Sequence, residues 1–247
     1  MASSHKLLKE YYPESQFGGL TDVDGTATFY LRIGSLVSQE SIVLDVGCGR
    51  GAHFDRPEDI RLWVRNLKGR CRKVIGIDLD PAARQNPGVD EFRLITSSTW
   101  PIEDSSIDVC ICDYVVEHVP DPNQFFAELR RVCKPGGFIC IRTANVLSYF
   151  GLAAKCIANR WHNRVLRIAQ PHRKAEDIFP TCYRCNTVFT MRKFFKKFGF
   201  EGYVYGHESE PTYLSFSKLA YALGVLHQRF APKFMRVGIM GFGRKRE

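Results

Sequence analysis

The sequence predicts an α/β fold: a doubly wound, seven-stranded, mostly parallel sheet with helices on both faces. Two observations carry this prediction. First, short apolar stretches rich in β-branched residues at 41–46, 73–78 and 107–112 each end at an acid or a glycine turn, as strands buried on both faces do. Second, helical patterns separate these stretches, and strands that alternate with helices favour a parallel sheet covered on both sides.

The first half of the chain supplies the core of this sheet. A glycine turn at 47–51 follows the first strand, and a helix is expected directly after it. Apolar residues stand at helical spacing over 125–132, the Lys-Pro-Gly-Gly stretch at 134–137 breaks this helix, and 138–141 starts another strand. Ligands of such sheets bind outside the carboxyl ends of the strands, where these glycines and acids fall.

The last part of the chain carries one more helix, at 189–198, and two strands, at 202–205 and 237–240. An apolar stripe beside three basic residues (Leu219, Leu223, Leu226 and Phe230 beside Lys218, Arg229 and Lys233) predicts an amphipathic helix. Its apolar face is expected to pack against the sheet, with contact to a membrane surface as the alternative. A second basic, apolar stretch at 147–169 is expected to be helical as well.

Length and composition fit a single globular domain of 247 residues with 45% apolar and 25% charged residues. Within it we expect an N-terminal flap and helix at 1–40 and a cofactor-binding core at 41–145. Helical insertions at 146–188 and 211–234 are expected to form a surface for the acceptor substrate, a membrane or a partner. The longest apolar run, Leu219 to Leu226, is too short for a bilayer-spanning helix, which needs about 20 residues. A cytoplasmic protein is therefore expected, with a possible place at the membrane surface.

The nine cysteines are odd in number and scattered, which predicts reduced thiols rather than a disulfide framework. Cys182 and Cys185 have the Cys-x-x-Cys spacing that is typical of zinc ligands. No second pair of Cys or His stands at a matching distance along the chain, so no metal site is expected.

Charge is divided unevenly between the two parts of the chain. Residues 1–150 hold 17 Lys and Arg against 20 Asp and Glu, whereas residues 151–247 hold 18 against 6, a net charge of +12. This asymmetry suggests an anionic partner for the C-terminal part, such as a phosphorylated substrate, a membrane surface or nucleic acid. The alternative, which the charge pattern supports equally, is that these basic residues form a solvent-exposed face without a partner.

The glycine turn indicates a cofactor site. Its glycines and Ala52 also fit the dinucleotide pattern, but Asp45 stands where a pyrophosphate would approach. The next acid at a strand end, Asp78, lies 31 residues beyond Gly47 rather than about 20. These features favour a cofactor that carries positive charge, which Asp45 can offset.

Four motifs in this order resemble those of class I S-adenosylmethionine-dependent methyltransferases, in the broad branch that includes quinone-biosynthesis methylases and sugar or lipid O-methyltransferases. They are Val-Leu-Asp-Val-Gly-Cys-Gly-Arg-Gly at 43–51, Val-Ile-Gly-Ile-Asp at 74–78, Glu-His-Val-Pro at 117–120 and Lys-Pro-Gly-Gly at 134–137. The resemblance covers about residues 41–145. It implies a seven-stranded sheet with a reversed last strand and S-adenosyl-L-methionine as the cofactor.

The resemblance also implies roles for individual residues. The glycines of the turn (Gly47, Gly49 and Gly51) contact the methionine part of the cofactor, and Asp78 accepts both ribose hydroxyls. Further cofactor contacts are expected from Cys48, Leu79 and Asp113. Many members of the family bind the adenine amine with an acid where this chain has Thr96, followed by Ser97, so a hydroxyl or backbone group is expected there instead.

Candidates for the acceptor side follow the later strands. His118 is the candidate general base, since an ordinary pKa of about 6.5 suits proton removal; alternatively Glu117 and His118 only order their loop. Acceptor-binding candidates are Asn145, Arg173, Tyr183 and Arg184. Gly18-Gly19 and the Phe29-Tyr30-Leu31-Arg32 stretch form a possible flap over the cofactor.

The sequence therefore predicts a methyltransferase for a small-molecule, glycan or lipid-linked acceptor, with O-methylation by in-line transfer as the leading reaction. The basic C-terminal part keeps RNA or other nucleic-acid methylation as an alternative, although the Asp/Asn-Pro-Pro-aromatic motif of exocyclic-amine enzymes is missing: Asp113 is followed by Tyr114 and Val115. A non-catalytic basic binding module on the same fold is the third possibility.

Overall fold

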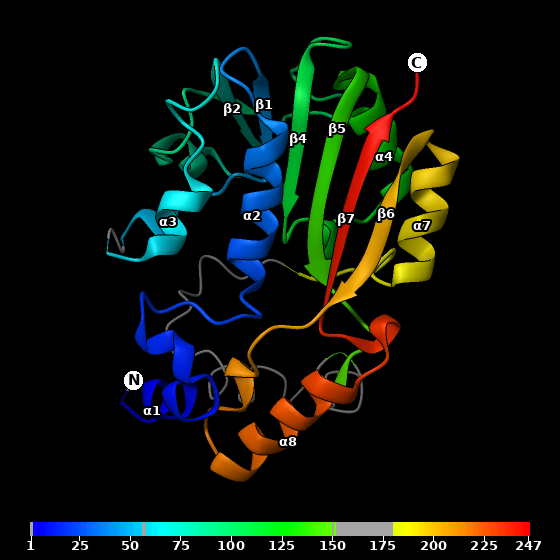
Figure 1. Ribbon diagram of the computed structural model, residues 1–247. Helices are drawn as coiled ribbons and strands as arrows, with labels where there is room; N and C mark the ends of the chain where they lie inside the picture. Colours follow the sequence, from blue (N-terminus) through cyan, green and yellow to red (C-terminus); the bar gives the residue numbers. More distant parts are fainter. Residues whose placement is uncertain (1, 56–57, 150, 152–179) are drawn as a thin grey trace.

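The computed structural model describes residues 2–55, 58–149, 151 and 180–247 (Figure 1). Seven strands form one sheet in the order β3-β2-β1-β4-β5-β7-β6, in which β7 runs antiparallel to both of its neighbours. The strands are β1 Ile42–Val46, β2 Lys73–Asp78, β3 Glu91–Leu94, β4 Ile107–Asp113, β5 Cys133–Ala144, β6 Phe200–His207 and β7 Gly238–Lys245. The predicted fold class, with its reversed last strand, is confirmed.

Helices cover both faces of the sheet and extend beyond its carboxyl edge (Figure 1). The α-helices are α1 Ala2–Tyr11, α2 Gly25–Leu36, α3 Ile60–Arg65, α4 Pro122–Val132, α7 Val188–Lys197 and α8 Lys218–Phe230. Short 3-10 turns join them, namely η1 Pro13–Gln16, η2 Ala52–Asp55, η3 Pro81–Gln85, η4 Val116–His118, η6 Thr212–Leu214 and η7 Lys233–Met235. The predicted helical stretch at 147–169 lies almost entirely outside the described residues.

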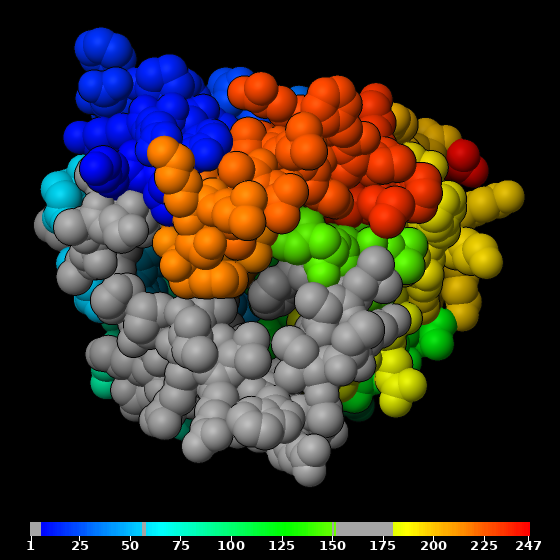
Figure 2. Space-filling model, turned by 90° about the horizontal axis from the view of Figure 1, so that it is seen from below, coloured from blue at the N-terminus to red at the C-terminus, as the bar shows by residue number. Residues whose placement is uncertain are grey.

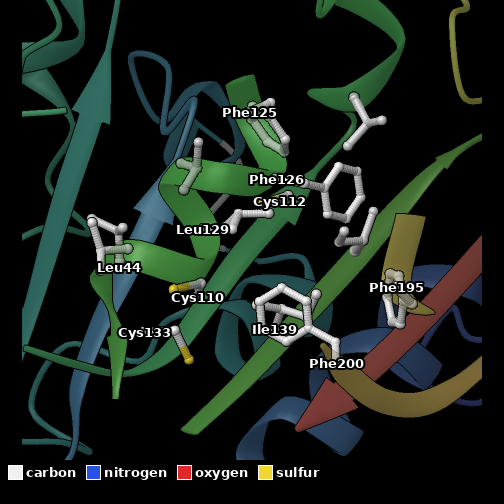
Figure 3. Packing of buried hydrophobic residues seen from close by; sticks show 14 of the residues in the cluster. Leu44, Cys110, Cys112, Phe125, Phe126, Leu129, Cys133, Ile139, Phe195 and Phe200 are labelled. Carbon is white, nitrogen blue, oxygen red and sulfur yellow. The ribbon is translucent and has the colours of Figure 1, made fainter. Parts of the chain in front are cut away.

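Each face of the sheet has its own apolar core. On one face α4 and α7 pack on β4 and β5, and Figure 3 shows Phe126 and Leu129 of α4 near Ile139 of the sheet and Phe195 of α7. The Phe126 ring stacks against Phe194 and Phe198 at centroid distances of 5.1 and 5.9 Å. On the other face, residues of α2 and α3 pack against β1, β2 and β4. Covering both faces explains why the central strands are apolar without alternation.

Three local expectations differ from the structure. The glycine turn leads into the 3-10 turn η2 and then the six-residue α3, capped by Asp59, instead of directly into a helix. The stretch at 134–137 is already extended: α4 ends at Val132, and β5 starts at Cys133, which pairs with Ile107. Strand β3 was not predicted, because half of its four residues are charged and all are only partly buried.

The stretch at 29–32 belongs to α2 and is no flap. The side chains of Phe29 and Tyr30 are buried against the sheet, with the Phe29 ring 5.6 Å from that of Phe242 in β7. Asp24 caps this helix by accepting a hydrogen bond from the Ala27 backbone N–H at 2.7 Å. Burial of both aromatic rings fixes α2 as part of the second core.

The stripe of α8 is exposed, contrary to the expectation that it packs on the sheet. The helix buries its other face, centred on Tyr221 and Val225, against Leu7 and Tyr12 beside α1. Leu219 and Phe230 of the stripe are 72% and 76% exposed. Together α1 and α8 form a cap beyond the carboxyl edge of the sheet (Figure 1).

Within the described residues, no helix has both the length and the apolar character needed to cross a bilayer. The eight cysteines described, Cys48, Cys71, Cys110, Cys112, Cys133, Cys140, Cys182 and Cys185, are all unpaired thiols. Cys185 is buried in the first core, and the Cys182 thiol lies 3.6 Å from the backbone oxygen of His118.

Candidate functional site

The carboxyl ends of β1, β2, β4 and β5 meet at one edge of the sheet. From β1 the chain passes first to β2 on one side and later to β4 on the other, so the glycine turn after β1 lies where the strand order reverses. Ligands of open α/β sheets bind in the crevice at such a point. The sequence-predicted residues Asp45, Asp78 and Asp113 all stand at or near the ends of these strands.

At two positions of the turn, both the positive φ of the backbone and the lack of space for a Cβ require glycine. Gly47 has φ +66°, and a Cβ there would lie 2.6 Å from a methyl carbon of Val115. Gly51 has φ +73°, and a Cβ there would lie 2.7 Å from Oδ1 of Asn86. Side chains other than glycine rarely adopt such φ values. The turn is therefore a tight backbone loop packed against the segment that leads to His118.

Hydrogen bonds hold the main chain of this turn in place. The backbone N–H groups of Gly47 and Cys48 both donate to Ile77 O, at 2.7 and 3.2 Å. The buried Asn86 amide donates to the backbone oxygens of Cys48 and Gly49, at 2.8 and 3.2 Å. The turn is thus preorganised by contacts with β2 and the segment after it, and Asn86 is a site-building residue that the sequence analysis missed.

Cys48 contributes its backbone to the turn, whereas its thiol points elsewhere. The side chain belongs to the second core, and a Cβ at Gly76 would lie 2.7 Å from its sulfur. Burial raises the pKa of this thiol, so the thiolate is disfavoured. The prediction that Cys48 contacts the cofactor therefore does not hold for its side chain, because the small thiol fills space beside β2.

Asp78 connects the turn with the loop after β2. Its Oδ2 accepts a hydrogen bond from the Gly49 N–H and its Oδ1 from the Asp80 N–H, both at 2.9 Å. A carboxylate offers about four lone-pair positions, so each oxygen can still accept a hydroxyl. Leu79 beside it is 74% exposed, which leaves an apolar surface next to the carboxylate.

The loop after β3 lies close to Asp78, since the Ile95 N–H donates to the backbone oxygen of Asp78 at 2.8 Å. The next two residues, Thr96 and Ser97, are exposed, and the Ser97 hydroxyl donates to Thr99 O at 2.9 Å. This places both predicted hydroxyl residues on the same side of the turn as Leu79.

Asp45 has an unusual electrostatic environment. Burial raises its pKa to about 7, the nearby carboxylates of Asp113 and Asp78 add to the rise, and Arg65 counteracts it. A carboxylate in such surroundings is stabilised by any cation that arrives. Asp45 therefore suits a positively charged ligand, and its contact with the cofactor stays a prediction.

Asp113, for which a contact with the cofactor stays a prediction, forms a buried ion pair within the protein. Arg142 of β5 donates to both of its oxygens, at 2.6 and 2.8 Å, and the Tyr30 hydroxyl donates at 3.0 Å. Burial acts to raise the pKa of Asp113, but the attraction of Arg142 outweighs burial and lowers it. This buried bidentate pair occupies the carboxylate and joins β4, β5 and α2.

Arg65 is a candidate that the sequence analysis missed. A guanidinium nitrogen lies 3.6 Å from Asp113 Oδ2, and the guanidinium carbon lies 5.3 Å from the centre of the Tyr30 ring. Its Nε is buried and has no hydrogen-bond partner among the residues described. Since an unsatisfied buried donor is costly, Arg65 can take an anionic group of a ligand here. A lone arginine at the end of a short helix gives no sequence signal.

On the acceptor side, His118 ends the 3-10 turn η4. Its Nδ1 lies 2.9 Å from the Pro180 carbonyl oxygen, and because a carbonyl only accepts, the neutral ring carries its proton on Nδ1. The lone pair is then on Nε2, the form that a general base needs. The neighbouring Glu117 is buried, burial raises its pKa, and its carboxylate accepts a hydrogen bond from the Thr143 hydroxyl at 2.7 Å.

The segment at 182–186 is held against this turn. The backbone N–H groups of Cys182 and Tyr183 donate to Glu117 O, at 2.6 and 3.0 Å. Tyr183 has φ +49°, which is uncommon for an aromatic residue, and its side chain is partly exposed. Arg184 is exposed as well. The structure thus brings Tyr183 and Arg184 near η4, while Arg173 lies outside the described residues.

Asn145, which the sequence predicts to bind the acceptor, has main-chain partners within the protein. It is buried, and its amide donates to Phe234 O and Arg236 O, at 2.8 and 2.7 Å. Its Oδ1 accepts from the Leu147 N–H at 3.0 Å. These bonds use both ends of the amide and tie the end of β5 to η7, so Asn145 stabilises the cap.

Comparison with known proteins agrees with this geometry. Residues 44–141 match the family model described as a methyltransferase domain. A probable S-adenosylmethionine-dependent methyltransferase from Mycolicibacterium smegmatis is 33% identical over 133 residues, covering 52% of this chain and 47% of that protein. A ubiquinone biosynthesis O-methyltransferase from Pseudomonas entomophila is 32% identical over 145 residues, covering 53% of this chain and 56% of the relative. The chain thus spans about half the length of these relatives.

A solved structure supports the fold over a larger share of the chain. The YcgJ protein from Bacillus subtilis superposes with a TM-score of 0.52 at 17% identity, covering 89% of this chain and 98% of that one. At this level of identity the likeness concerns the fold alone.

Proposed function

Since this chain is a member of the class I, Rossmann-like S-adenosylmethionine-dependent methyltransferases, we propose that it methylates a hydroxyl oxygen of a small-molecule, glycan or lipid-linked acceptor. S-adenosyl-L-methionine is the cofactor of this family and supplies an electrophilic methyl group on a positively charged sulfur. The observation that carries the proposal is the packing of the glycine turn on Val115, which brings the cofactor loop next to the η4 turn with His118.

Each part of the cofactor has a counterpart among the residues of the site. The backbone of the turn at 47–51 accommodates the methionine part, and Asp45 offsets its positive charge. Arg65 offers its unpaired Nε to the carboxylate of the same part. Asp78 accepts the ribose hydroxyls, and Leu79 packs against the adenine, with Thr96 and Ser97 at the edge of the base.

His118 serves as the general base in this proposal. As the acceptor oxygen forms its bond to the methyl carbon, the carbon–sulfur bond breaks, and Nε2 of His118 takes the proton of the hydroxyl. The Pro180 carbonyl accepts from Nδ1 and thereby holds the ring tautomer that can do so. Most of the acceleration comes from holding the acceptor in line at about 3 Å from the methyl group.

Oxygen as the acceptor atom is supported by a relative. The protein from Pseudomonas entomophila that matches 53% of this chain is named an O-methyltransferase. The Glu-His-Val-Pro motif of this chain also supports oxygen, because the proposed base His118 would serve a hydroxyl acceptor, which must lose a proton, more than an amine acceptor. O-methylation is therefore the reaction we propose.

The test is incubation with cofactor labelled on its methyl group and a cell lysate separated into lipid, glycan, small-molecule, RNA and protein pools. We expect label in one of the first three pools, and label in RNA alone would contradict the proposal. His118→Gln should lower turnover of the labelled acceptor about 10²–10⁴-fold while cofactor affinity in calorimetry stays unchanged. Near-normal turnover of His118→Gln would assign the residue a structural role only.

A further inference from the structure

Helix α8 has two apolar faces, and the described chain covers only one of them. The inner face packs Tyr221 and Val225 against Leu7 and Tyr12, and the Tyr12 hydroxyl donates to Gln228 Oε1 at 2.9 Å. Gly224 lets the helix approach the preceding loop, since a Cβ there would lie 2.5 Å from Pro211 Cβ. These contacts fix the orientation of α8 and leave its other apolar face outward.

The outer face exposes large apolar side chains in one row. They follow helical spacing and are exposed by 72, 58, 54 and 76% at Leu219, Leu223, Leu226 and Phe230. Phe216 before the helix and Phe234 after it extend the row. Figure 2 shows this segment, coloured orange, on the surface of the cap. Scattered apolar residues are normal on surfaces, but a contiguous row marks an interaction site.

Positive charges predominate in the segment that carries this row. Between residues 211 and 236 the chain holds four Lys and Arg and no Asp or Glu. Lys218 and Arg229 are exposed along one edge of the outer face, and exposed Lys233 follows the helix. Lys218 forms an ion pair with an acid of another element, Glu10 of α1, at 2.5 Å. A partner for this face must therefore be apolar at its centre and anionic at its rim.

We propose that the outer face of α8 docks on the surface of an anionic lipid bilayer. A helix with an apolar row and flanking Lys and Arg lies in the interface with its apolar side chains among the acyl chains and its cations at the head groups. The row also lacks polar side chains that would need specific partners in a protein interface. The charge complementarity thus favours lipid over a second copy of this basic chain.

Docking places the site beside the membrane. The segment 208–237, which contains α8, connects the carboxyl end of β6 with the start of β7, and its cap lies beyond the carboxyl edge of the sheet (Figure 1). That is the edge at which the glycine turn and His118 lie. The docking itself is independent of the proposed methyl transfer. Only the consequence, that the acceptor is carried in or at the bilayer, rests on the proposed function.

Co-sedimentation of the full chain with vesicles tests the docking without any turnover. We expect binding to vesicles of phosphatidylcholine with about 30% phosphatidylglycerol, weak binding to phosphatidylcholine alone, and loss of binding at high salt. The double variant Leu223→Gln, Leu226→Gln should lower the partition coefficient at least about tenfold. Lys233→Gln should lower it about fivefold.

Leu31→Gln is the matched control, because Leu31 is 59% exposed on α2, away from the cap. It should bind vesicles like the unchanged chain, and all variants should keep cofactor affinity in calorimetry, which shows that they fold. Equal binding of the α8 variants and the control, or no binding to anionic vesicles, would overturn the proposal. So would a dimer in sedimentation velocity that the double variant dissociates, since a second copy would then occupy the face.

Discussion

The cofactor side of the sheet edge and the cap beyond it are held together in different ways. Around the glycine turn, the backbone N–H and C=O groups of the turn itself make the hydrogen bonds. Their partners are the Ile77 backbone oxygen, the Asn86 amide and the Asp78 carboxylate. In the cap, side chains make the contacts, and some buried polar atoms, such as the Tyr221 hydroxyl and His227 Nδ1, have no hydrogen-bond partner among the described residues.

The cap also contains a buried acid, Glu208, whose carboxylate accepts a long hydrogen bond from the Val237 N–H at 3.3 Å. Burial raises the pKa of Glu208 to about 7, and the ring nitrogen of His227 lies 3.6 Å from its carboxylate, beyond hydrogen-bond distance. The cofactor side is thus a preorganised backbone cradle, whereas the cap is a layer held mainly by side-chain contacts. We infer that the common chemistry of the family resides in the first and the choice of acceptor in the second.

The largest expected effect concerns the buried pair of Asp113 and Arg142, which joins β4 and β5 on the cofactor side. Arg142→Met leaves the Asp113 carboxylate buried without its bidentate partner and should lower the free energy of unfolding by about 3–5 kcal/mol. Arg246→Ala is the matched control, because its pair with Glu201 at 2.5 Å is exposed and contributes about 0–1 kcal/mol. Urea denaturation measures both. Similar costs for the two variants would contradict a stabilising role of the buried pair.

The second prediction tests whether the cradle depends on close packing as well as on backbone conformation. Gly47→Ala adds a methyl group 2.6 Å from Val115 at φ +66° and should cost about 2–4 kcal/mol of unfolding free energy. Gly69→Ala has a similar φ, +79°, but open space around its Cβ, so about 1–2 kcal/mol is expected. If urea denaturation shows that both variants lose the same unfolding free energy, the contact with Val115 does not add to the cost of the Gly47 substitution.

The difference between the regions also explains what could be predicted from sequence. Strands β1, β2 and β4, the turn and Asp78 follow from local patterns, because an apolar run, a glycine cluster and a terminal acid are neighbours in the chain. The roles of Asp113 and Asn145 depend on partners far away in sequence. Arg142 stands opposite Asp113 through the register of β4 and β5, and the partners of Asn145 come from η7.

The α8 helix shows the same limit for packing. Its sequence has one apolar row at Leu219–Phe230 and another at Tyr221–Val225, and helical spacing alone does not tell which row is buried. The row at Tyr221–Val225 is the buried one because it packs against α1, which lies more than 200 residues earlier in the chain. Arg65 and Asn86 escape sequence analysis for the same reason, since only the folded chain brings them to the turn.

The third prediction separates the two regions by ligand binding. Asp78→Ala removes the carboxylate proposed to hold the ribose and should weaken cofactor binding in calorimetry by about 1.5–3 kcal/mol. Glu208→Gln, a change to a buried acid of the cap, should leave cofactor affinity within about twofold of the unchanged chain. A loss in the Glu208 variant equal to that in the Asp78 variant would show that the cap takes part in cofactor binding.

The smallest effect concerns pH and Asp45. In the free protein its pKa is raised to about 7, so about half of the molecules carry a neutral Asp45 at that pH. A cationic cofactor favours the carboxylate and lowers this pKa, so binding releases a proton and affinity rises as pH rises through 7. If only the carboxylate form binds, affinity should grow about tenfold from pH 6 to pH 8.

Asp45→Asn serves as the reference for this measurement, because it cannot titrate while the cofactor's own amino group titrates equally in both proteins. We expect the variant to bind more weakly at pH 8 and to lack the rise, so the ratio of the two affinities changes about tenfold between pH 6 and pH 8. Proton release measured by calorimetry in buffers of different ionisation enthalpy should disappear in the variant. A constant ratio would mean that a group other than Asp45 offsets the positive charge of the cofactor. The cradle would then recognise the cofactor through its backbone alone.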